Sequence, residues 1–146
     1  MKYKLITTID RPIKEIFDLM INPEYFNQWQ KTFIDYEVLS GKLAEQGCQT
    51  QLNYRYGKKI LQMKETLLTI EAPLAYSVTY ETDTVWNHVQ NRFHKLSENK
   101  TQWTFETEFK CKGWLKIMAK IMPFIFKGES KKAMKSFKIF VESKQN

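Results

Sequence analysis

The chain has 146 residues, of which 42% are hydrophobic, 27% charged and 14% aromatic, and its formal net charge is +7. This length suits one domain, residues 1–146, that builds a full core without disulfide or metal cross-links. No apolar stretch approaches the ~20 residues of a membrane span, and the N-terminal residues lack the apolar region of a signal peptide, so we expect a cytoplasmic protein.

The positive charge is concentrated in one part of the chain. Residues 110–138 contain nine lysines and a single acid, Glu129, whereas the rest of the chain is close to neutral. Arginine is scarce and no nucleic-acid-binding motif is present, so nucleic acid is not an expected partner. The basic character therefore belongs to one element and not to the whole surface.

The first 30 residues predict a strand and then one short helix. Alternating residues over 2–9 favour the strand. Asp10 or Arg11 is expected to cap a helix over 12–21, because a proline suits the first helical turn. The Asn22-Pro23 pair ends this helix. A group of aromatic residues follows: Tyr25, Phe26 and Trp29.

From residue 33 to residue 111 the apolar pattern alternates almost without interruption, which is typical of successive strands. The expected strands are 33–39, 48–56, 60–70, 75–81, 85–95 and 101–111.

The last two strands form a hairpin whose register decides which side chains face inward. Asn99 is the residue that best tolerates left-handed backbone, so we expect a three-residue loop, 97–99, with Phe93 opposite Trp103. The inward face is then Val85, Asn87, Val89, Asn91, Phe93, Trp103, Phe105, Thr107, Phe109 and Cys111.

Residues 113–144 predict a helical stretch that Pro123 kinks or splits in two. The second part has an apolar stripe at helical spacing with a basic stripe opposite. The apolar stripe is Phe126, Ser130, Ala133, Met134, Phe137, Phe140 and Val141, and the basic stripe is Lys127, Lys131, Lys135 and Lys138.

Several short patterns occur in a characteristic order along nearly the whole chain. They are Ile9–Pro12, Phe17–Leu19, Asn22-Pro23 with Trp29 after it, Gly41 and Gly47 around a loop, Glu65, Glu71–Leu74, and Asn99–Thr101. Together they resemble the START-like superfamily, also called Bet v 1-like or SRPBCC proteins, and within it the bacterial polyketide cyclase/dehydrase and lipid-transport branch.

This resemblance implies an α+β, helix-grip fold. A seven-stranded curved antiparallel sheet would wrap around a long C-terminal helix, with one short helical region between the first two strands, and would enclose a cavity. Members of the superfamily bind lipids, sterols, hormones or polyketides, and a minority are enzymes, so the resemblance alone does not assign an activity.

The expected inward face is apolar with a few polar side chains, which suits a pocket for a hydrophobic or amphipathic small molecule. The alternative is that the polar groups satisfy one another or bind buried water. The residues expected to line the pocket are Tyr54, Met63, Glu65, Tyr80, Asn87, Val89, Asn91, Trp103, Phe105, Thr107, Met122, Phe126 and Met134.

Glu65 is the one candidate for acid–base chemistry, because it lies in a row with Leu61, Met63 and Leu67. Burial would raise its pKa and make it a possible general acid or base. The sequence favours the alternative, in which Glu65 lies at the sheet edge or a bulge turns it outward.

No other catalytic or metal-binding pattern is present. His88 and His94 fall on the outward face, where His88 is expected to pair with Glu108, and no third ligand has metal spacing. Cys48 and Cys111 are expected to be free, buried thiols. We therefore expect no metal and no cofactor.

The basic segment is a second candidate site. Trp114, Lys116, Lys120 and Lys127 lie in a stretch that is apolar nearly all round, which would suit contact with an anionic membrane surface or an acidic partner. The alternative is a packed helix whose lysines are only solvated.

The sequence thus favours a non-enzymatic carrier or sensor that binds a lipid-like or polyketide-like molecule in a cavity. The open alternatives are a polyketide cyclase or dehydratase-type enzyme that uses Glu65 or a cavity tyrosine, and a membrane-surface or protein-interaction module that uses the basic segment.

Overall fold

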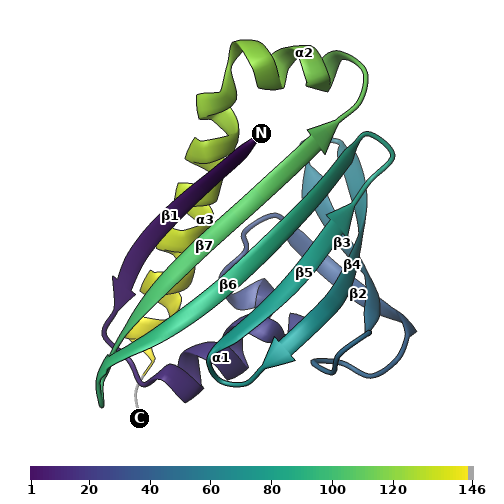
Figure 1. Cartoon of the computed structure of the whole chain (residues 1–146). Coiled ribbons are helices and arrows are strands. Elements are labelled where there is room, and N and C mark those ends of the chain that lie inside the picture. The colour runs from purple at the N-terminus through teal and green to yellow at the C-terminus, as the bar shows by residue number, and fades with distance from the viewer. Residues whose placement is uncertain (145–146) are drawn as a thin grey trace.

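The computed structural model describes residues 1–144 and arranges seven strands in one antiparallel sheet (Figure 1). The strands lie in the order β1-β7-β6-β5-β4-β3-β2, so each is paired with its neighbour in sequence except β1, which joins β7. This confirms the expected seven-stranded sheet. The bounds are β1 Lys2–Ile9, β2 Phe33–Ser40, β3 Gln49–Tyr56, β4 Lys59–Glu71, β5 Ala75–Glu81, β6 Val85–Ser97 and β7 Lys100–Cys111.

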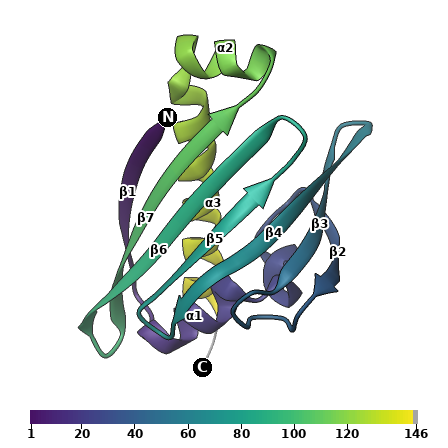
Figure 2. The same cartoon turned by 45° about the vertical axis from the view of Figure 1, so that its right-hand side comes forward.

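Four helical elements accompany the sheet, namely α1 (Ile13–Ile21), the short 3-10 helix η1 (Pro23–Gln28), α2 (Trp114–Ile121) and α3 (Pro123–Ser143). Figures 1 and 2 show α3 running along one face of the sheet, with α1 at one end of the molecule and α2 at the other. We call the sheet face that carries α3 the inner face. The expected α+β helix-grip architecture is confirmed, as is the split of the C-terminal helical stretch at Pro123.

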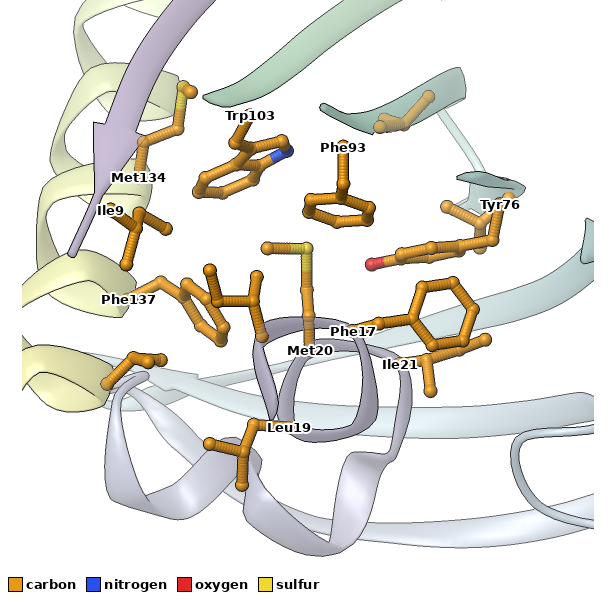
Figure 3. Close-up of a cluster of buried hydrophobic side chains, with 14 of the residues drawn as sticks. Ile9, Phe17, Leu19, Met20, Ile21, Tyr76, Phe93, Trp103, Met134 and Phe137 are labelled. Atoms are coloured by element: carbon orange, nitrogen blue, oxygen red, sulfur yellow. The ribbon is translucent and has the colours of Figure 1, made fainter. Parts of the chain in front are cut away.

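The hydrophobic core lies between the inner face, α1 and α3 (Figure 3). Trp103, Phe93 and Tyr76 stack in a row across three strands, with neighbouring ring centroids 6.4 Å apart in each case. Phe17 from α1 meets Tyr76 edge-on at 5.7 Å, and Phe137 from α3 meets Trp103 edge-on at 5.6 Å. These edge contacts attach both helices to the same aromatic row.

The β6–β7 register is as expected, because Phe93 is paired with Trp103. The predicted three-residue loop is wrong: Ser97 pairs with Lys100, and the turn is Glu98-Asn99. The register shifts between Lys95 and Ser97, so Leu96 is the unpaired extra residue of β6. The turn is therefore one residue shorter, and Asn99 does not adopt left-handed backbone. Among residues 1–144, Ala44 is the one non-glycine residue with positive φ.

The start of α1 also differs from the prediction. Its N-cap is Pro12, with extended backbone and no side-chain capping bond, and not Asp10 or Arg11. Arg11 instead donates two hydrogen bonds of 2.6 Å from Nη2 to the carbonyls of Glu142 and Lys144 at the end of α3. Arg11 therefore supplies hydrogen-bond donors to carbonyls at the end of α3, which have no partners within the helix.

The apolar stripe of α3 is narrower than expected. Met134, Phe137 and Val141 are buried at i, i+3 and i+7, whereas Ala133 is exposed. Helix α3 therefore contacts the sheet along one line, and a residue about 100° away from that line reaches solvent.

Candidate functional site

A row of polar side chains crosses the inner face near the end of the sheet that carries α2. Thr50, Glu65, Tyr80 and Asn87 are successive register partners on β3, β4, β5 and β6. Residues paired in register point to the same face of a sheet, so the four side chains are neighbours. Thr50, Glu65 and Asn87 are buried, and Tyr80 is half-buried.

Glu65 is only 3% exposed, so the prediction that favoured an outward position is wrong. Strand β4 is not at an edge, and its pairing irregularity falls between Leu67 and Thr69, beyond Glu65. Among residues 1–144, no lysine, arginine or histidine forms an ion pair with Glu65.

Burial raises the pKa of Glu65 from its ordinary value of 4.5 to about 8, and a hydrogen bond from Tyr80 offsets part of that rise. Desolvation disfavours the carboxylate because no cation replaces the lost water. At neutral pH this side chain is therefore mostly a protonated carboxylic acid, which both donates and accepts a hydrogen bond. Burial beside Glu65 also raises the pKa of Tyr80 well above its ordinary value.

The inner face is not completely covered around this row. Tyr80 lies on the central strand of the sheet between two buried neighbours, yet it is only half-buried. Met63 and Tyr54 toward one edge, and Phe105 toward the other, are also half-buried although they share its face. The side chains of α1 and α3 therefore leave part of the inner face unpacked.

Two of the polar residues expected to line the pocket are engaged by other protein groups. Asn91 accepts a hydrogen bond of 2.9 Å from Nε1 of Trp103, and both groups are buried. Asn87 donates from Nδ2 to Oγ1 of Thr107 (2.6 Å) and to the carbonyl of Glu108 (3.0 Å). These amides match the alternative in which the polar groups satisfy one another.

The remaining expected lining residues are spread over the interior and one end of the molecule. Val89 and Met134 are buried in the core. Phe126 packs against Phe109 at 5.3 Å between ring centroids, near the start of α3. Met122 lies at the junction of α2 and α3 and is 38% exposed, so it does not line the same space as Glu65.

The tyrosine at the edge of this region has a fixed partner. Tyr54 donates a hydrogen bond of 2.7 Å to Oε1 of Gln30, and its ring meets Phe33 edge-on. Burial raises the pKa of Tyr54 far above its ordinary value. Tyr56, two residues further on the same face, is exposed. The alternation of buried and exposed residues along β3 therefore stops at the end of the strand.

Sequence reasoning missed two residues of the inner face. Thr50 is buried in register with Glu65, and Tyr76 is buried opposite Asn91. Tyr76 lies four residues before Tyr80 on the same strand, so the period of two could have identified it.

Hollows of the described surface include one on each face of β1. One of about 470 Å³ lies against β1, β6 and β7 and is lined mainly by outward-facing polar side chains. The other, about 230 Å³, is a groove between β1 and α3 that has Leu5, Thr7 and Met134 among its lining residues. Neither includes Glu65 or Tyr80, so neither is the enclosed cavity that the sequence predicted.

The histidines and cysteines form no reactive cluster in the described residues. His88 is in register with Glu108 as expected, but the Glu108 carboxylate pairs with Lys2 at 3.0 Å, not with His88. Cys48 is buried and Cys111 only half-buried, and both are free. Within residues 1–144 no group of three His, Cys, Asp or Glu side chains could hold a metal ion.

The basic segment is placed at the far end of the molecule from α1 (Figure 1). Trp114, Lys116 and Lys120 lie on α2, and Lys127 lies in the first turns of α3; all four side chains are exposed. None of the helices in residues 1–144 is long and apolar enough to cross a membrane.

Solved structures share this arrangement over the whole chain. Ara h 8.0201 superposes with a TM-score of 0.79 at 13% identity, with 99% of each chain covered. The chain therefore has the Bet v 1-like helix-grip fold. No protein-family model and no curated protein sequence matches it.

Bacterial structures with this Bet v 1-like (SRPBCC) fold are similarly close. A conserved protein from Geobacillus kaustophilus has a TM-score of 0.76 at 13% identity and covers 97% of this chain and 93% of its own. The di-domain ARO/CYC StfQ from the steffimycin biosynthetic pathway has a TM-score of 0.75 at 15% identity, over 96% of this chain and 44% of its own. At such identities the likeness establishes the fold alone.

Proposed function

We propose that the protein binds a hydrophobic or amphipathic small molecule, lipid-like or polyketide-like, against the inner face of its sheet, as a carrier or a sensor. The observation that carries this proposal is the uncharged, buried Glu65 in the middle of a face that its helices cover incompletely. Structures of the same fold include the di-domain ARO/CYC StfQ from the steffimycin biosynthetic pathway.

The chemistry of the site suits a ligand with one oxygen-bearing end. Burying apolar ligand surface against Met63 and Phe105 contributes about 25 cal/mol per Å². The protonated Glu65 carboxyl can donate a hydrogen bond to a carbonyl or hydroxyl of the ligand. The Tyr80 phenol, whose hydrogen is donated to Glu65, can accept one from a ligand hydroxyl. A pocket of this kind takes its affinity from apolar contact and its orientation from few polar groups.

The first test is native mass spectrometry of the purified protein, followed by organic extraction and identification of any bound molecule. A stoichiometric lipid-like or polyketide-like mass would support the proposal. If the protein is isolated empty, binding of the fluorescent probe anilinonaphthalene sulfonate and its displacement by oleate provide the second measurement.

Matched variants on β4 locate the site. Met63→Trp fills space on the inner face, and we expect it to weaken probe binding about tenfold or more, equivalent to ~1.4 kcal/mol. Ile60→Trp adds the same bulk at an exposed position on the same strand and should leave binding unchanged. Equal binding by wild type and Met63→Trp, or no binding by wild type, would contradict the proposal.

A second candidate function is acid–base catalysis at Glu65, of the polyketide cyclase or dehydratase type. It is favoured by one observation: a pKa near 8 lets this carboxyl exchange a proton near neutral pH. A turnover assay with a poly-β-ketone substrate tests it. Glu65→Gln should lower the rate about 100-fold or more, and the wild-type rate should change near pH 8. An unchanged rate in Glu65→Gln would exclude this function.

A further inference from the structure

Helix α2 buries none of its eight residues, although five of them are large and apolar. Trp114, Ile117 and Ile121 are 69%, 60% and 69% exposed and follow one another at i, i+3 and i+7. They therefore form one stripe along a single side of the helix. The stripe continues past the Pro123 junction to Phe124, which is 67% exposed, and Ile125, 38% exposed. We call these five residues the apolar tip.

The apolar tip is not the side by which α2 is attached to the protein. Leu115, Met118 and Ala119 are the less exposed positions of the helix, and α2 contacts β7 and α3. Leu115 and Ala119 are four residues apart and therefore share the attached side. Figure 1 shows α2 lying across the end of the molecule, and the high exposure of Trp114, Ile117 and Ile121 places their side chains on the side of α2 that is free of the protein.

Lysines surround the apolar tip. Lys112, Lys116, Lys120 and Lys127 are exposed, and none of them has a carboxylate within ion-pair distance in residues 1–144. The one acid of the segment, Glu129, is paired with Lys132 at 3.4 Å. The end of the molecule therefore combines an exposed apolar stripe with unpaired positive charge.

This combination fits an anionic lipid surface better than it fits a second copy of the chain. A symmetric dimer through the apolar tip would bring the same lysines of two copies together, and like charges would oppose association. At an anionic bilayer the apolar side chains enter the region below the headgroups, and the lysines contact the phosphates. A tryptophan at such a boundary is favoured because its ring is apolar and its N–H is polar.

We propose that α2 and the start of α3 dock this protein on a bilayer rich in anionic phospholipid. Docking is peripheral, with α2 parallel to the membrane plane and the apolar tip inserted. It does not require the inner face of the sheet, so it goes beyond the proposed ligand binding. If that ligand is a lipid, docking places the end of the sheet that carries α2 beside the ligand's source.

The experiment is flotation of the full-length protein with vesicles of phosphatidylcholine alone or mixed with phosphatidylglycerol. Wild type should bind the mixed vesicles, bind phosphatidylcholine vesicles much less, and dissociate as salt is raised. The fluorescence of Trp114 gives an independent readout, because the other three tryptophans are buried or half-buried. Its emission should shift to shorter wavelength on binding, and Trp114→Phe should lose the shift.

Two sets of variants separate the apolar and the basic contributions. Trp114→Ser/Ile117→Ser/Ile121→Ser changes only exposed side chains, so it should fold normally and lose most vesicle binding. Lys116→Gln/Lys120→Gln should weaken binding about 25-fold, because each lysine near an anionic surface contributes about fivefold. Lys95→Gln/Lys100→Gln removes the same charge at the opposite end of the molecule (Figure 1) and should bind like wild type.

Three outcomes would overturn the proposal. The first is no binding by wild type to the mixed vesicles, and the second is equal loss in both pairs of lysine variants. The third is a concentration-dependent dimer that the triple serine variant abolishes, because the apolar tip would then be a contact between copies. None of these results bears on probe binding by Met63→Trp, so the two proposals fail separately.

Discussion

Glu65 and Tyr80 oppose each other directly across strands β4 and β5, on the inner face of the sheet. The phenol donates to a carboxyl that has no cationic partner in residues 1–144. Burial raises the pKa of Glu65 and the hydrogen bond from Tyr80 offsets part of that rise, whereas burial and the charge of Glu65 both raise the pKa of Tyr80. Glu65 therefore holds its proton more tightly in the folded protein than in water, which makes its protonation state measurable through protein stability.

Glu65→Gln should change how stability depends on pH. The folded-state pKa of Glu65 is raised to about 8, whereas the unfolded value is about 4.3, so between these values the folded state holds a proton that the unfolded state has lost. The free energy of unfolding of wild type should fall as pH rises through this window, whereas that of the glutamine variant should not show this fall. The difference in unfolding free energy between the variant and wild type, measured by urea unfolding, should therefore shift by roughly 3 to 5 kcal/mol in favour of the variant between acid and alkaline pH.

Glu71→Gln is the matched control, because Glu71 lies at the exposed end of the same strand. Its stability difference from wild type should stay constant across the same window. A constant difference for Glu65→Gln as well would mean that Glu65 ionises in the folded protein as it does in water.

Asn91→Leu should destabilise the fold. The substitution removes the acceptor of the Trp103 indole N–H and leaves that donor unpaired in the core, which costs about 1 to 3 kcal/mol. A double-mutant cycle with Trp103→Phe isolates the interaction, since Asn91→Leu should cost less when the indole donor is absent. An equal cost in both backgrounds would show that the hydrogen bond does not contribute.

The fold could be predicted from the sequence because period and turn residues act locally. Alternation over β6 and β7, with Phe93 and Trp103 opposed, determined the inward face. Pro123 determined the division between α2 and α3. The hairpin loop could not be predicted, because two turns connect the strands in the same register. One is a three-residue loop with a left-handed Asn99, and the other is a two-residue turn with a register shift at Leu96.

The candidate site was less predictable, because it depends on contacts between distant residues. A glutamate in a strand gives no signal of its exposure, and Glu65 is buried because its side chain lies on the inner face of an interior strand, in register with Thr50 and Tyr80. The roles of Asn91 and Arg11 depend on partners 12 and at least 131 residues away. The exposure of α2, in contrast, agrees with a segment that is apolar nearly all round and has too little sheet to cover it.

Arg11→Lys should loosen the end of α3. The guanidinium reaches two carbonyls of the last turn at once, and a lysine ammonium cannot reproduce this fork, so we expect a loss of about 1 to 2 kcal/mol. Hydrogen exchange should accelerate at the amides of the last turn of α3 before those of its middle. Arg92→Lys, at an exposed site on β6, should change neither stability nor hydrogen exchange. Similar effects at both sites would argue against a specific role for the two hydrogen bonds of Arg11.

Phe137→Ala should be among the most destabilising single substitutions. Phe137 is fully buried and meets both Trp103 and Trp29 edge-on, at 5.6 and 5.1 Å, so it joins α3 to the sheet and to the segment after η1. Truncation leaves a cavity beside these two tryptophans, and we expect a loss of about 3 to 5 kcal/mol in urea unfolding. Ile139→Ala, on the exposed side of the same helix, should cost no more than about 0.5 kcal/mol. If the two substitutions cost the same, α3 does not attach to the sheet through this contact.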